Sequence, residues 1–191
     1  MEEKLKQHTS DRLRVVLFGP ESTGKTVLAE MLAKHFNTVW TPEFSRLYAE
    51  AKIANNEMLS YDDVLPIAIG QMTLENEMIL KANKLLICDT NLLETKVYSE
   101  FYYDGKCPEI VKKFALEHIY DLHFLTYIDL PWEADNIRDK PLERKEMFDA
   151  FEQALITNKK TYVLLKGTMK ERFDDAVKHI NQLIEKDEIY R

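Results

Sequence analysis

Short runs of apolar residues alternate with longer amphipathic stretches along this chain. Five such runs predict β-strands, at residues 13–18, 38–40, 85–88, 124–130 and 162–165. The runs are nearly continuous rather than alternating, so both faces of each strand are expected to be covered. This pattern is typical of a mainly parallel sheet with helices on both sides.

Between the runs, apolar residues recur every three or four positions, as in amphipathic helices. The clearest sets are Leu28, Met31, Leu32 and Phe36; Phe148, Phe151 and Leu155; and Phe173, Val177, Ile180 and Ile184. Ser60 and Asp63 predict a capping box at the start of a helix that continues to Lys81. Alternating strands and helices predict a doubly wound α/β domain with right-handed crossovers.

The length of 191 residues and a hydrophobic content of 45% fit one domain with a real core. We therefore expect a polar N-terminal extension at residues 1–11 and a single domain at residues 12–191. No apolar run approaches the ~18 residues of a membrane span, and the N-terminus lacks the apolar core of a signal peptide. With only Cys88 and Cys107, no disulfide framework is expected, which favours a cytoplasmic protein.

The formal net charge of −7, without a basic stripe, argues against a nucleic-acid partner. A small-molecule substrate, including a cationic one, is compatible with this charge. The oligomeric state stays open, and a homo-oligomer is compatible with the sequence.

The most specific motif follows the first apolar run. Gly19, Pro20, Glu21, Ser22, Thr23, Gly24, Lys25 and Thr26 match G-x-x-x-x-G-K-[ST]. The backbone N–H groups of such a loop, together with the next helix N-terminus, bind phosphates. Lys25 is expected to reach the β- and γ-phosphates and Thr26 to ligate Mg²⁺. The sequence therefore predicts a P-loop NTPase fold that binds ATP and Mg²⁺.

Two carboxylates follow other predicted strands. Asp89 ends the third run, where P-loop enzymes hold Mg²⁺, and it is a catalytic candidate; the alternative is a cap for the next helix. Glu43 follows the second run and could orient or deprotonate an acceptor hydroxyl, with Arg46 contacting phosphate or substrate. The alternative for Glu43 is an ordinary acid at a helix start. The sequence does not decide which carboxylate takes the proton.

A charged segment after the fourth run predicts a lid at about residues 131–147. Arg138 is the candidate that neutralises charge on the transferring phosphoryl group. Trp132 could stack on a cationic aromatic ligand, because ring faces attract cations. Lys140 and Arg144 fit a solvated surface loop equally well.

Several segments together carry a family resemblance. They are the phosphate loop, residues 42–48, residues 67–71, residues 88–91 with Thr95, and residues 131–138. With them the chain resembles the ribosylnicotinamide kinase domain of NadR-type proteins, over nearly its whole length after Arg12. The more discriminating parts are E-x-x-R-x-Y, from Glu43 to Tyr48, and W-x-x-D-x-x-R, from Trp132 to Arg138.

The resemblance implies a nucleoside-kinase-like fold with a five-stranded parallel sheet. It also implies transfer of the ATP γ-phosphate to the 5′-hydroxyl of nicotinamide riboside, giving nicotinamide mononucleotide. The substrate-binding residues implied are Glu43, Arg46, Tyr48, Asp89, Trp132 and Asp135. The sequence departs from full NadR proteins in lacking an H-x-G-H motif and in having Asn136 where glycine is expected.

Three alternatives remain. The first is another small nucleoside or deoxynucleoside kinase. The second is a nucleotide-dependent switch or ATPase of the AAA type, a label that such sequences can carry. The third, a degenerate nucleotide-binding scaffold, is weakened by the intact Lys25, Thr26 and Asp89.

Overall fold

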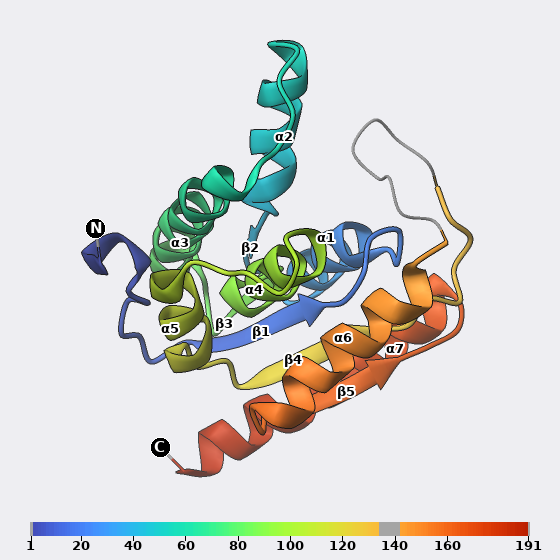
Figure 1. The fold of residues 1–191 in the computed structure, drawn as a ribbon. Helices are drawn as coiled ribbons and strands as arrows, with labels where there is room; N and C mark the ends of the chain where they lie inside the picture. The colour runs from blue at the N-terminus through green and yellow to red at the C-terminus, as the bar shows by residue number, and fades with distance from the viewer. Residues whose placement is uncertain (1, 134–141, 191) are drawn as a thin grey trace.

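The structure, a computed structural model, describes residues 2–133 and 142–190 (Figure 1). The strands are β1 (Leu13–Phe18), β2 (Trp40–Thr41), β3 (Leu85–Asp89), β4 (Leu122–Thr126) and β5 (Tyr162–Leu165). The α-helices are α1 (Lys25–His35), α2 (Phe44–Ala54), α3 (Val64–Lys81), α4 (Leu92–Tyr102), α5 (Glu109–Glu117), α6 (Arg144–Thr157) and α7 (Met169–Tyr190). Two 3₁₀ turns lie at Glu2–Leu5 and Tyr61–Asp63.

The five strands form one parallel sheet in the order β2-β3-β1-β4-β5. This confirms the predicted five-stranded parallel sheet. Because all strands run the same way, their carboxyl ends meet at one edge, where ligands bind in open α/β sheets. β1 is central, so the loop that follows it lies in the middle of that edge.

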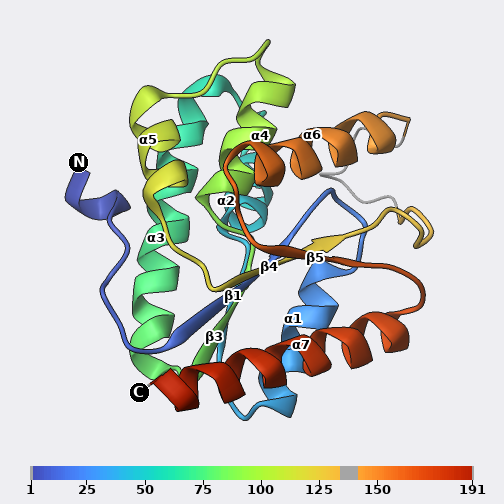
Figure 2. The same cartoon turned by 90° about the horizontal axis from the view of Figure 1, so that it is seen from below.

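Helices cover both faces of the sheet, as Figure 2 shows. α1 and α7 pack on one face, through a core that contains Val15 and Leu17 of β1. α3, α4 and α6 pack on the other face, where Val16 and Phe18 of the same strand point. The continuous apolar run of β1 therefore serves two cores, as its sequence predicts.

Two predicted strands differ from the observed ones by more than one residue, and β3 extends one residue beyond its prediction, to Asp89. The fourth run was expected at residues 124–130, but β4 begins at Leu122 and ends at Thr126. Its partner β5 ends at Leu165, whose carbonyl accepts the N–H of Tyr127, so the later residues have no strand to pair with. The second run was expected at residues 38–40, but only Trp40 and Thr41 pair with β3.

The polar N-terminal segment packs against the domain. Leu5 is fully buried, and its carbonyl accepts a hydrogen bond from Nε2 of His118 at 2.8 Å. The amide of Asn76 on α3 bonds the backbone of Lys6 and His8. Sequence polarity alone did not reveal these contacts, because the segment buries its backbone rather than most of its side chains.

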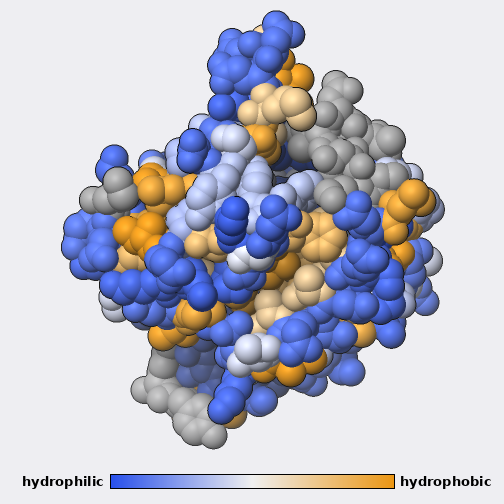
Figure 3. Space-filling model, viewed as in Figure 1, coloured by the Kyte–Doolittle hydropathy of each residue, from blue (hydrophilic) through white to orange (hydrophobic). Residues whose placement is uncertain are grey.

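The α2 helix stands out from the body of the molecule (Figure 1). Its only buried residue is Ala49. The predicted capping box of Ser60 and Asp63 is present and starts the turn that leads into α3. In Figure 3, hydrophilic residues predominate on this face and hydrophobic residues are scattered among them. This protruding arm, residues 44–63, forms one wall of the cavity described next.

Candidate active site

Both glycines of the phosphate-loop motif have a positive φ, a backbone conformation that glycine adopts readily. Gly19 and Gly24 have φ of 137° and 80°, a region that side chains disfavour. A Cβ on Gly19 would lie 2.7 Å from Oγ1 of Thr126, and one on Gly24 would lie 2.5 Å from Cε of Met169. Ser22, at the turn of the loop, also has a positive φ of 56°. The positive φ thus favours glycine at both motif positions, and at Gly19 the backbone oxygen of Thr126, 3.0 Å from such a Cβ, also leaves no room for a side chain.

Lys25 is folded back over the start of the loop. Its ammonium group donates to the carbonyls of Gly19 at 2.6 Å and Pro20 at 3.0 Å, and it lies 3.3 Å from Oε1 of Glu94. Burial by itself lowers the pKa of Lys25, but the carboxylates of Glu94, Glu43 and Asp89 outweigh this effect and raise it. Lys25 is therefore a fully charged cation in the cleft.

Thr26 and Asp89 lie side by side, as predicted for a metal site. The hydroxyl of Thr26 donates to Oδ2 of Asp89 at 2.6 Å. Asp89 is completely buried, and within the described residues its Oδ1 has no hydrogen-bond partner. Burial first, and then repulsion by Glu43, raise the pKa of Asp89 to about 6, while Lys25 opposes the shift.

This pair fits Mg²⁺. The ion prefers oxygen ligands and is commonly held by one or two protein groups, with waters and substrate phosphates completing the shell. A hydroxyl and an unpartnered buried carboxylate oxygen supply such a set. The described residues contain no cluster of three or more acidic, cysteine or histidine ligands, so a dedicated cage for another metal is absent from this part of the chain.

The alternative of a helix-capping role for Asp89 is wrong. Asp89 is the last residue of β3, and α4 is capped by Asn91, whose side chain accepts the N–H of Glu94. Thr90, between them, has a φ of 82°, which is rare for a β-branched residue. Such outliers cluster at functional sites, and this one lies in the turn that joins Asp89 to the capped helix.

Glu43 lies directly before α2, on the wall of the cavity. It accepts a hydrogen bond from the hydroxyl of Ser45 at 2.5 Å. Arg46 also lines the cavity and lies 3.8 Å from Glu50. Tyr48 turns elsewhere: its hydroxyl donates to Asp63 at 2.9 Å. The structure thus brings Glu43 and Arg46 to the cavity and gives Tyr48 a role in holding the arm.

The beginning of the predicted lid contacts the phosphate loop. The N–H of Glu133 donates to the Ser22 hydroxyl at 2.7 Å. Arg144 donates to the carbonyls of Ser22 at 3.2 Å and Leu130 at 3.1 Å, and its guanidinium lies 5.4 Å from the centre of the Trp132 ring. Arg144 therefore organises the loop instead of being a solvated side chain.

The middle of the predicted lid, residues 134–141, lies outside the described residues, whereas its end from Arg144 onward is the first turn of α6. Asp135, Arg138, Asn136 and Lys140 fall in this middle part, so the roles predicted for them stay predictions. Trp132 is half-buried and its ring contacts Arg144, so a role in stacking on a substrate also stays a prediction.

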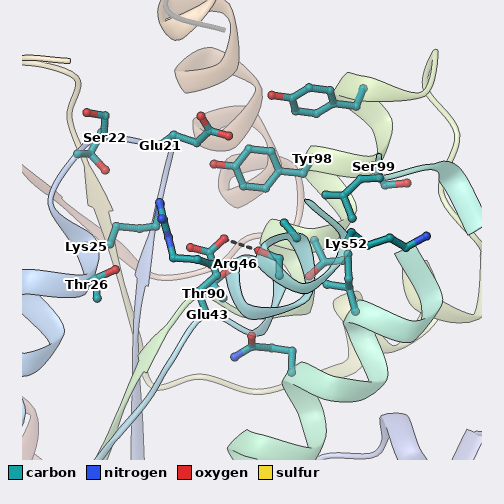
Figure 4. A pocket seen from close by; sticks show the side chains of 18 of the residues that line it. Glu21, Ser22, Lys25, Thr26, Glu43, Arg46, Lys52, Thr90, Tyr98 and Ser99 are labelled. Atoms are coloured by element: carbon teal, nitrogen blue, oxygen red, sulfur yellow. Dashed lines mark hydrogen bonds between the residues drawn. The ribbon is translucent and has the colours of Figure 1, made fainter. Parts of the chain in front are cut away.

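A cavity of about 740 Å³ connects the phosphate loop with the protruding arm. In Figure 4, Lys25 and Thr26 lie on one side and Tyr98, Ser99 and Lys52 on the other, with Glu43 and Arg46 between them. Three tyrosines line the cavity, at positions 98, 102 and 103. The space is thus continuous from a phosphate-binding end to an aromatic end.

Two buried charged residues of this region were missed from the sequence. Glu94, at the first turn of α4, accepts the N–H of Gly19 at 3.2 Å besides facing Lys25. Burial raises its pKa to about 8, although Lys25 pulls it down. Arg172 of α7 is fully buried and donates to the carbonyl of Thr23 at 2.8 Å. Asn91 followed by Glu94 resembles a capping pair, and nothing in the sequence distinguishes Arg172 from an exposed helix residue.

None of the helices in the described part of the chain is long and apolar enough to cross a membrane.

Comparisons with known proteins support the same family from two directions. The model of a family described as "AAA domain" matches residues 14–172. The trifunctional NAD biosynthesis/regulator protein NadR of Salmonella typhimurium is 30% identical over 155 residues, covering 80% of this chain and 38% of the relative. The Escherichia coli protein of the same name is 30% identical over 152 residues, covering 78% of this chain and 37% of that protein. The chain thus spans less than two fifths of the length of these relatives.

Solved structures share the fold. A crystal structure of NadR protein in complex with NR superposes with a TM-score of 0.74 and 20% identity, covering 91% of this chain and 51% of that one. Thymidylate kinase from Ehrlichia chaffeensis superposes with a TM-score of 0.64 and 16% identity, covering 90% of this chain and 100% of that one. Thymidylate kinase from Candida albicans gives a TM-score of 0.68 at 17% identity, covering 94% and 95% of the two chains. The phosphate loop, the sheet order and these matches lead to one conclusion: the chain belongs to the P-loop family described as AAA domain and is homologous to NadR.

Proposed function

We propose that this protein is an ATP-dependent kinase that phosphorylates the 5′-hydroxyl of nicotinamide riboside. The observation that carries the proposal is the cavity that joins the phosphate loop to a tyrosine-lined end, with Glu43 on its wall. A kinase needs room for an acceptor beside its nucleotide, and a simple nucleotide switch does not. The nicotinamide part is supported by the likeness to a NadR protein whose crystal structure is a complex with NR.

The nucleotide end of the proposed mechanism uses the phosphate loop. Backbone N–H groups of residues 19–26 and the N-terminus of α1 would bind the ATP phosphates. Lys25 would neutralise charge on the β- and γ-phosphates. Thr26 and Asp89 would hold Mg²⁺, which, when bound, stabilises negative charge on the transferring group.

The acceptor end uses the opposite wall. Glu43 lines the cavity, whereas Asp89 is fully buried beside Thr26 and is absent from the cavity lining. Glu43 is therefore the better group to orient the ribose hydroxyl and accept its proton, a role worth about 10²- to 10⁴-fold in rate. The pyridinium ring of the riboside would lie toward Tyr98 and Tyr102, because ring faces attract cations.

The decisive experiment is a screen of acceptors with γ-labelled ATP and Mg²⁺. Nicotinamide riboside, purine and pyrimidine nucleosides and deoxynucleosides are compared at equal concentration, with Lys25→Ala as the inactive control. The proposal expects nicotinamide riboside to give the highest kcat/KM. A preference for a deoxynucleoside would favour the alternative of a small deoxynucleoside kinase. ATP hydrolysis without transfer to any acceptor would refute both.

A further inference from the structure

Glu94 connects the two ends of the phosphate loop. One carboxylate oxygen, Oε2, accepts the N–H of Gly19, the first residue of the motif, at 3.2 Å. The other, Oε1, lies 3.3 Å from the ammonium of Lys25, the seventh residue. The Glu94 side chain is 1% exposed, and within the described residues Oε1 accepts no hydrogen bond. Among the described residues, the negative charge on this oxygen is therefore balanced by the ammonium group of Lys25 and not by a hydrogen bond.

The ammonium group of Lys25 lies between three oxygens. It donates hydrogen bonds to the carbonyls of Gly19 and Pro20 and forms an ion pair with the carboxylate of Glu94. A phosphate oxygen that binds Lys25 therefore competes with the charge of Glu94 for the ammonium group. Glu94 is the most distant of the three, and as an anion it repels the incoming phosphate.

From this geometry we propose that Glu94 is a positioning residue that competes with the nucleotide for Lys25. In the empty cleft it holds the ammonium group against the start of the loop. Nucleotide phosphates draw the ammonium group away, so Glu94 weakens nucleotide binding and keeps Lys25 ordered until the nucleotide arrives. The inference rests on the nucleotide-binding part of the proposed function and is independent of the acceptor.

A purely structural role makes a different prediction. Glu94 occupies the first turn of α4, where an acid complements the helix dipole. If that were its whole role, its removal would destabilise the protein and leave nucleotide affinity unchanged or weakened. Tighter binding is therefore the result that separates the two roles.

The test is calorimetric titration of the Glu94→Gln variant with a non-hydrolysable ATP analogue and Mg²⁺. The titration is run roughly one and a half pH units above the pKa of Glu94, which burial raises to about 8, so that this carboxyl is ionised. Glutamine keeps an acceptor for the Gly19 N–H and removes the charge. We expect the Kd to fall on the order of tenfold, as for the loss of a like charge at an effective dielectric of about 20. The KM for ATP should fall in parallel, without a rise in kcat.

Glu75→Gln is the matched control. Glu75 is equally buried and forms an ion pair with Arg14 at the same 3.3 Å, away from the phosphate loop. The Glu75→Gln variant should be less stable than wild type but bind the ATP analogue with the same Kd. An unchanged or higher Kd for Glu94→Gln would overturn the inference. Failure of the wild-type protein to bind the analogue would instead refute the proposed function. If Glu94→Gln does not fold, Glu94→Asp replaces it, because the shorter side chain moves the charge away from Lys25. A lower Kd would again support the inference, and an unchanged or higher Kd would overturn it.

Discussion

Replacing Arg172 with methionine should destabilise the protein and loosen its phosphate loop. The guanidinium is fully buried and donates to the carbonyls of Thr23 at 2.8 Å, Tyr127 at 2.9 Å and Gly167 at 3.0 Å. It also pairs with the carboxylate of Asp129. One side chain thus joins the loop to the carboxyl ends of β4 and β5.

The size of the effect follows from what the substitution leaves behind. Removing one partner of a buried ion pair costs about 3–5 kcal/mol of unfolding free energy. Asp129 is 30% exposed and can be partly rehydrated, which places the expected loss near 3 kcal/mol. In a domain of this size, 3 kcal/mol corresponds to a fall in Tm of about 6–12 °C.

Differential scanning calorimetry without nucleotide measures this loss. The matched control is Lys170→Met on the same helix, where the side chain is 82% exposed and pairs with Asp174 at the surface. Its Tm should stay within about 4 °C of wild type, because exposed ion pairs contribute little to stability. An Arg172→Met variant that melts within the same range would refute the view that this arginine supports the loop.

Three further outcomes follow from the site. Asp89→Asn should lower activity about 100-fold and raise the Mg²⁺ concentration needed for half-maximal rate, since a neutral ligand holds the ion less well; an unchanged Mg²⁺ titration would contradict the metal role. Glu43→Gln should lower kcat by about 10²-fold or more with little change in the KM for ATP, as steady-state kinetics can show; a change confined to KM would leave it a binding residue. Burial lowers the pKa of His123 to about 4. From pH 6.5 down to 4 the unfolded chain therefore takes up a proton that the folded protein does not, and the unfolding free energy falls. Urea titrations should show that His123→Phe loses less stability than wild type over this window; equal losses would argue against a buried neutral imidazole.

The features of this protein that depend on neighbouring residues could be predicted from the sequence. The phosphate loop is recognisable because a chain that turns tightly enough to point its N–H groups inward needs glycine at fixed positions, and Gly19 and Gly24 supply it. β1 and β5 were predicted within their observed bounds because continuous apolar runs report burial on both faces. The capping box at Ser60 and Asp63 also depends on near neighbours only.

Residues whose roles depend on distant partners were decided by the tertiary structure alone. Glu94 is 75 positions from the Gly19 N–H that it accepts, and Arg172 is 149 positions from Thr23. The spacing around each of them is that of an ordinary helix. Likewise, only the structure shows that β3 extends to Asp89 and that Asn91, two residues later, caps α4. Sequence fixes what the backbone needs locally, whereas the partner of a buried charge depends on which elements the fold brings together.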